Sequence, residues 1–320
     1  MRRRDVLKLA ALSAGVPALQ RLAGAQQRSM PIIDTHIHLF DPTRPGGVPW
    51  PEKGDVIYKP SLPARYAALA EPLGVVGAIA IECSPLASDN DWVLNVIAQN
   101  PVMVGMVGDL VPGSPSYRKD LDRLHANPLF LGIRYGNLWN RDLFVDIDKP
   151  GFVDGLKALA AAGLVMDSAN PDPRLIAAIL RVTERVPDLR IVIDHLPHAA
   201  VPTGKAERDE YWANLRRLAR SPHVFVKLSE IPVRVDGKLV TDPSHYRESL
   251  DAIWDVFGDD HILYGSDWPN SDHVATYAQT FAIVRAYVAG KDAAAREKFF
   301  WKNSIAAYRW KRRRPDQPAL

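Results

Sequence analysis

Residues 32–40, Ile-Ile-Asp-Thr-His-Ile-His-Leu-Phe, form an apolar stretch that carries two imidazoles two positions apart. In a β-strand successive side chains point to opposite faces, so His36 and His38 share one face and Asp34 precedes them on it. Two buried histidines beside a carboxylate are costly unless they bind something. A single histidine in a strand is usually a satisfied structural residue. The pair instead indicates a site for a divalent metal or a polarised carbonyl.

Seven further short apolar runs follow this stretch and are rich in Val, Ile and Leu on both faces. Such runs are typical of strands in a buried parallel sheet. They are residues 75–83, 103–110, 129–135, 164–167, 190–194, 223–228 and 261–265.

Amphipathic segments of helical period separate most of these runs. Eight strand–helix units in one chain predict an α/β fold, a single-domain (β/α)8 TIM barrel, over residues 26–320. A doubly wound open sheet would explain the same alternation with fewer strands. No Gly-x-Gly-x-x-Gly follows the first strand, so the dinucleotide-binding form of that fold lacks support.

The first 25 residues have the pattern of an export signal. A basic segment with an Arg-Arg pair (residues 2–8) precedes a short apolar run (9–19) and the small residues Ala23-Gly24-Ala25. This pattern is similar to a twin-arginine signal and predicts a periplasmic or secreted protein. An amphipathic N-terminal helix is the alternative. The apolar run is too short to span a bilayer.

The charge balance gives no electrostatic reason for nucleic-acid binding. Removing residues 1–25 takes away five of the 40 Lys and Arg residues and one of the 37 Asp and Glu residues, leaving 35 basic and 36 acidic ones. A nearly neutral chain does not attract nucleic acid or anionic lipid. With Cys83 as its single cysteine, the chain has no intramolecular disulfide and no zinc cage built from cysteines.

Polar side chains stand at the end of nearly every predicted strand, where a barrel collects its reactive groups. A Pro- and Gly-rich segment, residues 41–63, follows the first strand and is expected to fold over the same mouth. Imidazoles and carboxylates beside an arginine and a lysine suit a small anionic or hydroxylated substrate. The strand-end residues are His36, His38, Glu82, Asp109, Arg134, Asp167, Asp194, His195, Lys227, Ser229, Glu230, Ser266 and Asp267.

Five motifs, in order, resemble the amidohydrolase superfamily, in particular the amidohydrolase-related branch that includes sugar-lactone and pyrone-dicarboxylate lactonases. The resemblance covers residues 31–310. The motifs are Asp-Thr-His-Ile-His-Leu-Phe-Asp-Pro (34–42), Gly-Ile-Arg (132–134), Val-Ile-Asp-His (192–195), Val-Lys-Leu-Ser (226–229) and Leu-Tyr-Gly-Ser-Asp-Trp-Pro (263–269).

The resemblance implies a barrel hydrolase with a specific catalytic set. His36 and His38 would be metal ligands or carbonyl polarisers, His195 a further ligand or hydrogen-bond donor, and Asp267 the base that activates water. The same roles follow from the chemistry, since ester hydrolysis needs a water, a proton acceptor and positive character near the oxyanion.

Three other strand-end residues are candidates for substrate binding. Arg134 could hold a substrate carboxylate through two parallel contacts. A salt bridge with the neighbouring acids is its structural alternative. Lys227 has the same two interpretations. Glu82 is the third candidate, and its alternative is a solvated side chain with no role in substrate binding.

One departure from the family leaves the metal open. Metal-dependent members carry a histidine at the end of strand 5, where this chain has Asp167. One divalent ion, Zn or Mn, could still bind through His36, His38 and Asp267, with His195 or Glu82 as further ligands. Catalysis without metal is the alternative.

The expected function is hydrolysis of a small polar cyclic ester, a lactone, by water activated at Asp267. A decarboxylase or C–N hydrolase of the same superfamily is the enzymatic alternative. A non-catalytic exported binding protein is the alternative from another class. No stable membrane insertion is expected, and the oligomeric state is open.

Overall fold

Eight parallel strands form one closed barrel in the computed structural model, which describes residues 30–319. Neighbouring strands pair in the order β1-β2-β3-β4-β5-β6-β7-β10. The barrel closes where Asp267 N donates to His36 O at 2.8 Å and His38 N donates to Trp268 O at 2.7 Å. The strands are β1 (Ile32–Ile37), β2 (Val75–Ile81), β3 (Met103–Gly108), β4 (Phe130–Arg134), β5 (Val165–Ser168), β6 (Arg190–Ile193), β7 (Val224–Leu228) and β10 (Ile262–Tyr264).

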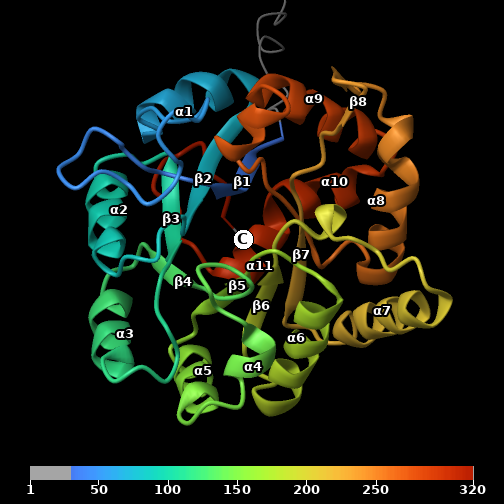
Figure 1. Cartoon of the computed structure of the whole chain (residues 1–320). Helices are drawn as coiled ribbons and strands as arrows, with labels where there is room; N and C mark the ends of the chain where they lie inside the picture. The colour runs from blue at the N-terminus through green and yellow to red at the C-terminus, as the bar shows by residue number, and fades with distance from the viewer. Residues whose placement is uncertain (1–29, 320) are drawn as a thin grey trace, which may run out of the picture.

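Most of the helices form a ring around the barrel, which Figure 1 shows in a view along the barrel axis. Apolar side chains on the outer face of the strands pack against this ring in one large cluster. The α-helices are α1 (Pro63–Ala70), α2 (Ser88–Ala98), α3 (Tyr117–His125), α4 (Leu143–Asp146), α5 (Phe152–Ala161), α6 (Pro173–Arg185), α7 (Lys205–Leu218), α8 (Ser244–Phe257), α9 (Tyr277–Val288), α10 (Ala293–Glu297) and α11 (Asn303–Tyr308).

Short helical turns and one small hairpin complete the chain. The hairpin, β8 (Arg234–Val235) with β9 (Lys238–Leu239), follows β7 and was not predicted. The turns are the 3-10 helices η1 (Glu71–Leu73), η2 (Leu196–His198) and η3 (Asn270–His273) and the π-helical η4 (Lys298–Lys302).

The C-terminal segment closes the barrel at the amino ends of the strands. Arg190, the first residue of β6, donates from Nε to Ala307 O at 2.7 Å. Gln317 donates from Nε2 to Val76 O and Pro101 O at 2.9 and 2.8 Å. Tyr308 belongs to the apolar cluster inside the barrel. The opposite mouth, at the carboxyl ends of the strands, is therefore the end that can hold a site.

The predicted TIM barrel is confirmed. All eight predicted strands occur, with boundaries that differ by at most three residues. Over the described part of the chain, no helix has the length and apolar character needed to cross a membrane. The predicted export signal lies outside the described residues.

Candidate active site

A local irregularity in β1 decides which of its side chains face the barrel. The pairing register of β1 with β2 shifts between Asp34 and Ile37. Asp34 accepts hydrogen bonds from Tyr66 and Tyr277, at 2.9 and 3.1 Å, which lie on the outer helices α1 and α9. The expectation that Asp34 shares a face with His36 and His38 was wrong, because one extra residue in the strand reverses the alternation.

The two histidines of β1 converge on the carboxylate that follows β10. His38 Nε2 lies 3.1 Å and His36 Nε2 lies 3.5 Å from Asp267 Oδ1. All three side chains are buried, and the two imidazole rings meet edge to face with centroids 4.9 Å apart. Strand closure brings together residues that are more than 220 positions apart in the sequence.

His195 joins this group from the end of β6. Its Nε2 lies 3.9 Å from Asp267 Oδ1, and its ring centroid lies 4.4 Å from that of His36. Ser229 Oγ, 2.8 Å from His195 Nδ1, fixes the other side of the ring. Three imidazoles therefore surround one carboxylate oxygen, as the predicted catalytic set requires.

Burial and neighbouring charges set the ionisation of this group. Burial acts to raise the pKa of Asp267, but the imidazoles of His195, His38 and His36 outweigh it and lower that pKa below its ordinary value. Burial lowers the pKa of His195 to about 4 and that of His36 well below its usual range. At neutral pH the site holds an ionised Asp267 beside neutral imidazoles of His36 and His195.

A cavity of about 190 Å³ opens onto this group, and we call it the reaction cavity. Two tryptophans from different loops stand on its wall with amide and carboxyl side chains. Trp50, from the segment predicted to fold over the mouth, lies with its ring centroid 5.5 Å from that of His38. The lining residues are His38, Trp50, Cys83, Arg134, Leu138, Trp139, Asn170, His195, Glu230, Asp267 and Asn270.

Glu230 was named from the sequence as a strand-end residue without a role, whereas Trp139, Asn170 and Asn270 were not found. Five residues of the cavity wall have a positive φ although none is glycine: Trp139 (58°), Asn170 (55°), His195 (52°), Glu230 (52°) and Asp267 (59°). Such conformations cluster at functional sites, where the surrounding structure holds them. The sequence carries no local signal for Trp139, Asn170 and Asn270, whereas Glu230 was found because it follows a strand.

Arg134 lies on the cavity wall, but its hydrogen bonds are largely used within the protein. Its Nε donates to Asp194 Oδ2 at 3.0 Å and its Nη1 to Glu82 O at 3.0 Å. Its Nη2 lies 3.4 Å from His195 Nε2. The ion pair was one of the two predicted interpretations of Arg134, and its contact with substrate stays a prediction.

Lys227 lies deeper than the cavity, in a group that we call the buried ion cluster: Lys227, Asp167, Asp194 and Tyr308. Lys227 Nζ lies 2.6 Å from Asp167 Oδ2, 2.9 Å from Asp194 Oδ1 and 3.2 Å from His36 Nδ1, and the lysine is fully buried. Tyr308 donates to Asp167 at 2.9 Å. The structure places Lys227 beneath His36 rather than on the cavity wall.

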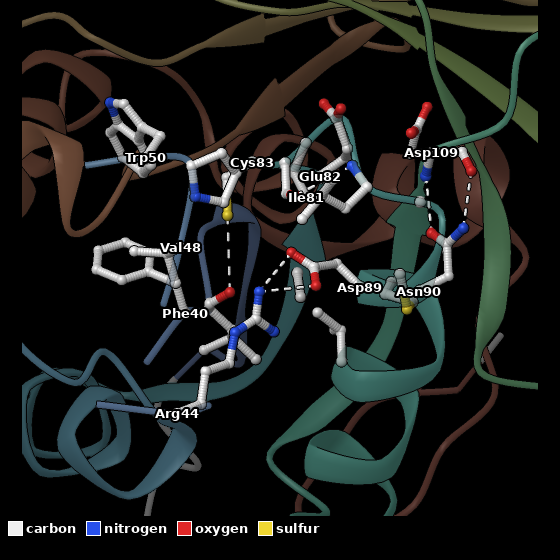
Figure 2. A pocket seen from close by; sticks show the side chains of 18 residues that line it. Phe40, Arg44, Val48, Trp50, Ile81, Glu82, Cys83, Asp89, Asn90 and Asp109 are labelled. Atoms are coloured by element: carbon white, nitrogen blue, oxygen red, sulfur yellow. Dashed lines mark hydrogen bonds and ion pairs between the residues drawn. The ribbon is translucent and has the colours of Figure 1, made fainter. Parts of the chain in front are cut away.

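Glu82 also lies off the reaction cavity, in the region drawn in Figure 2. Arg44 pairs there with Asp89, and Asn90 bonds to the backbone of Asp109. The space in this region is only about 20 Å³, enough for about one water molecule. Both carboxyl oxygens of Glu82 are buried without a hydrogen bond, and burial raises its pKa to about 8. We therefore do not assign substrate to this region.

The arrangement around Asp267 fits one divalent ion. His38 Nδ1 lies 3.0 Å from Ile81 O, which can only accept, so Nδ1 carries a proton; Nε2 then donates to Asp267 when the ring carries a second proton and turns a lone pair toward Asp267 when it does not. Two facing acceptors need a proton or a cation between them. His36 Nε2 is buried without a hydrogen bond among the described residues, and it lies within reach of the same point.

The role of His36 in such a site depends on its other nitrogen. Nδ1 faces both Lys227 Nζ at 3.2 Å and Asp194 Oδ1 at 3.5 Å. Neutral His36 presents a free Nε2 lone pair when Nδ1 donates to Asp194, and an Nε2–H when Nδ1 accepts from Lys227. His36 is thus a metal ligand in the first arrangement and a hydrogen-bond donor to substrate in the second.

Comparisons with known proteins identify the family of the chain. Residues 33–310 match the profile of a family described as Amidohydrolase. The chain is 31% identical over 300 residues to an L-fucono-1,5-lactonase of Burkholderia ambifaria, covering 90% of this chain and 98% of that one. It is 25% identical over 292 residues to a 4-sulfomuconolactone hydrolase of Rhizobium radiobacter, covering 83% of this chain and 86% of the other.

A solved structure shows the same fold. A zinc-bound crystal structure of an amidohydrolase from Burkholderia multivorans superposes with a TM-score of 0.75 at 22% identity, covering 88% of this chain and 99% of that one.

Proposed function

Because the chain belongs to the amidohydrolase family, we propose that it hydrolyses a small, hydroxylated cyclic ester by water that Asp267 deprotonates. One observation carries this proposal. Asp267 Oδ1 lies 3.1, 3.5 and 3.9 Å from the nearest nitrogens of His38, His36 and His195, on the wall of a cavity at the barrel mouth. A carboxylate with three imidazole nitrogens within 4 Å of one of its oxygens can orient and deprotonate one water molecule.

The reaction needs one proton acceptor and one place for negative charge. The water oxygen forms a bond to the ester carbonyl carbon while its proton passes to Asp267. The carbonyl oxygen gains charge and the bond to the ring oxygen then breaks. The ring oxygen takes up a proton, so ester and water give a hydroxy acid.

The cationic and hydrogen-bonding groups around the cavity stabilise the oxyanion. The Arg134 guanidinium, with its Nη2 3.4 Å from His195, and the imidazoles supply this positive character. A divalent ion held by His38, Asp267 and His36 would add Lewis-acid polarisation of the carbonyl when bound. We include such an ion in the proposal, since the donor set fits it.

The charges at the mouth favour a hydroxylated substrate over an anionic one. Arg134 is paired with Asp194, and Lys227 is sealed between Asp167 and Asp194. Trp50, Asn170 and Glu230 remain on the wall to meet hydroxyl groups and ring faces. The similarity to L-fucono-1,5-lactonases supports a sugar lactone as the substrate.

A lactone panel tests the proposal. Purified protein is offered sugar lactones, a dicarboxylate lactone and linear esters in H₂¹⁸O, with and without chelator, and with a trap for carbon dioxide. We expect one ¹⁸O in the hydroxy acid from a sugar lactone, no trapped carbon dioxide, and slower hydrolysis after chelation that added Zn or Mn restores. Carbon dioxide release without ring opening would instead indicate a decarboxylase. Full activity in the metal-free protein would remove the ion from the proposal.

We also propose that the protein is exported. The Arg-Arg pair, short apolar run and small residues within residues 1–25 support a twin-arginine signal. The Arg3→Lys, Arg4→Lys double variant should accumulate in the cytoplasm while the unaltered chain reaches the periplasm. Equal distribution of both chains would refute the signal.

A further inference from the structure

A second cavity of about 170 Å³ adjoins the reaction cavity, and we call it the outer cavity. Glu230, Asp267 and Asn270 line both, so the two spaces meet at these three residues. The outer cavity continues past them toward His198, His273 and Val274. At roughly 10–15 Å³ per water molecule it has room for a group of several non-hydrogen atoms.

One amide side chain fixes the junction between the cavities. Asn270 Nδ2 donates to Asp267 Oδ2 at 2.7 Å and to Glu230 Oε1 at 2.9 Å. The carboxyl of Glu230 is thereby held in a fixed orientation relative to the proposed base. The backbone of Glu230 has a φ of 52°, in the left-handed region. This conformation is further evidence that the surrounding structure holds Glu230 in place.

The second carboxyl oxygen of Glu230 has unused hydrogen-bonding capacity. No hydrogen bond reaches Oε2 from the described residues, and the nearest nitrogens of His195 and His198 each lie 3.9 Å away. His195 belongs to the reaction cavity and His198 to the outer cavity. Oε2 therefore stands between the two spaces, where a hydroxyl group of a bound molecule could reach it.

The wall of the outer cavity suits hydroxyl groups better than charged ones. It offers imidazole, amide and carboxyl groups with the apolar Pro232 and Val274, and no Lys or Arg side chain. His273 is bonded on both nitrogens, to Asp55 and to Asn270 O, at 2.8 and 2.7 Å. An anionic group would find no Lys or Arg side chain on this wall, and the ring nitrogens of His273 are already used by Asp55 and Asn270, whereas a polyol would find acceptors and apolar contacts.

We propose that the outer cavity binds a hydroxylated side chain that the lactone carries outside its ring, with Glu230 Oε2 accepting a hydrogen bond from one of its hydroxyls. This inference rests on the proposed function. With the ester carbonyl at Asp267, a ring substituent that enters the outer cavity lies beside Glu230, because Asp267 and Glu230 line both cavities. Glu230 is then a residue that determines specificity, and the outer cavity is a subsite.

The test compares two lactones of the same ring size and ring stereochemistry, one unsubstituted and one bearing a 1,2-dihydroxyethyl group. We expect the wild-type protein to show a kcat/KM at least tenfold higher for the substituted lactone. Glu230 also lines the reaction cavity, so Glu230→Ala should lower kcat/KM for both lactones, but at least tenfold more for the substituted one than for the unsubstituted one, mainly through KM.

A variant that fills the outer cavity tests the subsite independently of Glu230. Val274→Phe should lower kcat/KM for the substituted lactone alone. The matched control Val201→Phe, at a valine that is 43% exposed and lines neither cavity, should change neither value.

The outcomes separate this inference from the function on which it rests. Equal wild-type values for the two lactones, or equal losses on both in Glu230→Ala, overturn the subsite while lactone hydrolysis stands. The wild-type comparison decides the question even if a variant fails to fold. Absence of hydrolysis with every lactone overturns the proposed function and this inference together.

Discussion

Two groups of ionisable side chains lie one above the other in the barrel; the upper group borders the reaction cavity and the lower group does not. In the buried ion cluster, Lys227 is fully buried and meets carboxylates of Asp167 and Asp194 at 2.6 and 2.9 Å. Among residues 30–319, Asp167 Oδ1 of this cluster and His36 Nε2 near Asp267 both lack a hydrogen bond, but His38, His195 and Asp267 line the reaction cavity. The buried ion cluster therefore has a structural role, and the group around Asp267 is arranged to bind a reactant.

His36 connects the two groups through its two nitrogens. Its Nδ1 faces Lys227 and Asp194, and its Nε2 faces Asp267. Charge at the end of a strand is therefore not enough to identify a catalytic group. The group around Asp267 is distinguished by unsatisfied hydrogen-bonding capacity beside a cavity.

The largest effect is expected from removal of the proposed base. Asp267→Asn keeps the size of the side chain but cannot take a proton from water, so kcat should fall by roughly 10³-fold or more. Steady-state kinetics on the preferred lactone measure this, with circular dichroism to check the fold. Turnover within tenfold of the wild-type value would contradict the assignment of the base.

Breaking the buried ion cluster should act on stability. Lys227→Met leaves the buried Asp167 without its cation and Asp194 with Arg134 alone, and should lower the free energy of unfolding by about 3–5 kcal/mol. Denaturant titration measures the loss. The control Lys205→Met removes an exposed pair with Asp209 and should change stability by less than about 1 kcal/mol. Similar losses in both variants would remove the distinction between buried and exposed pairs.

Replacing Glu82 should have a smaller effect on the free energy of unfolding, and this effect should depend on pH. Its pKa is raised by burial to about 8, above the ordinary 4.5, so the stability of the folded state falls as pH rises from 4.5 through 8. Glu82→Gln removes this ionisation. The variant should gain on the order of 2 kcal/mol relative to wild type between pH 5 and pH 8. Parallel stability curves for the two proteins would show that Glu82 is not buried as described.

The smallest effect should be the pH dependence of activity between pH 5 and 7. An ordinary histidine titrates in this interval, but burial lowers the pKa of His195 to about 4 and the imidazoles around Asp267 lower the pKa of that carboxyl. Both groups keep their charge state across the interval, so kcat/KM should change by less than about twofold. A tenfold rise with a midpoint near pH 6.5 would indicate a solvated His195.

Much of the site could be predicted because a parallel barrel collects the carboxyl ends of its strands. His36, His38, His195 and Asp267 were chosen as residues at strand ends, and the structure brings all four together. Lys227, Arg134 and Glu82 were chosen in the same way and lie nearby, but the sequence could not say which cations were already paired. Lys227 is sealed by Asp167 and Asp194, and the side chain of Glu82 lies in the separate region beside Asp89 and Asp109, so neither residue lines the reaction cavity.

The sequence by itself determined the barrel, its strand order and the chemical types at its mouth, because these depend on hydrophobic period and on the direction of each strand. The tertiary structure alone decided that Asp34 turns outward, that Lys227 is sealed beneath His36, and that Glu230 and Asn270 join two cavities. A strand bulge, a buried ion pair and a left-handed backbone each depend on contacts between distant segments. Such contacts have no local signature in the chain.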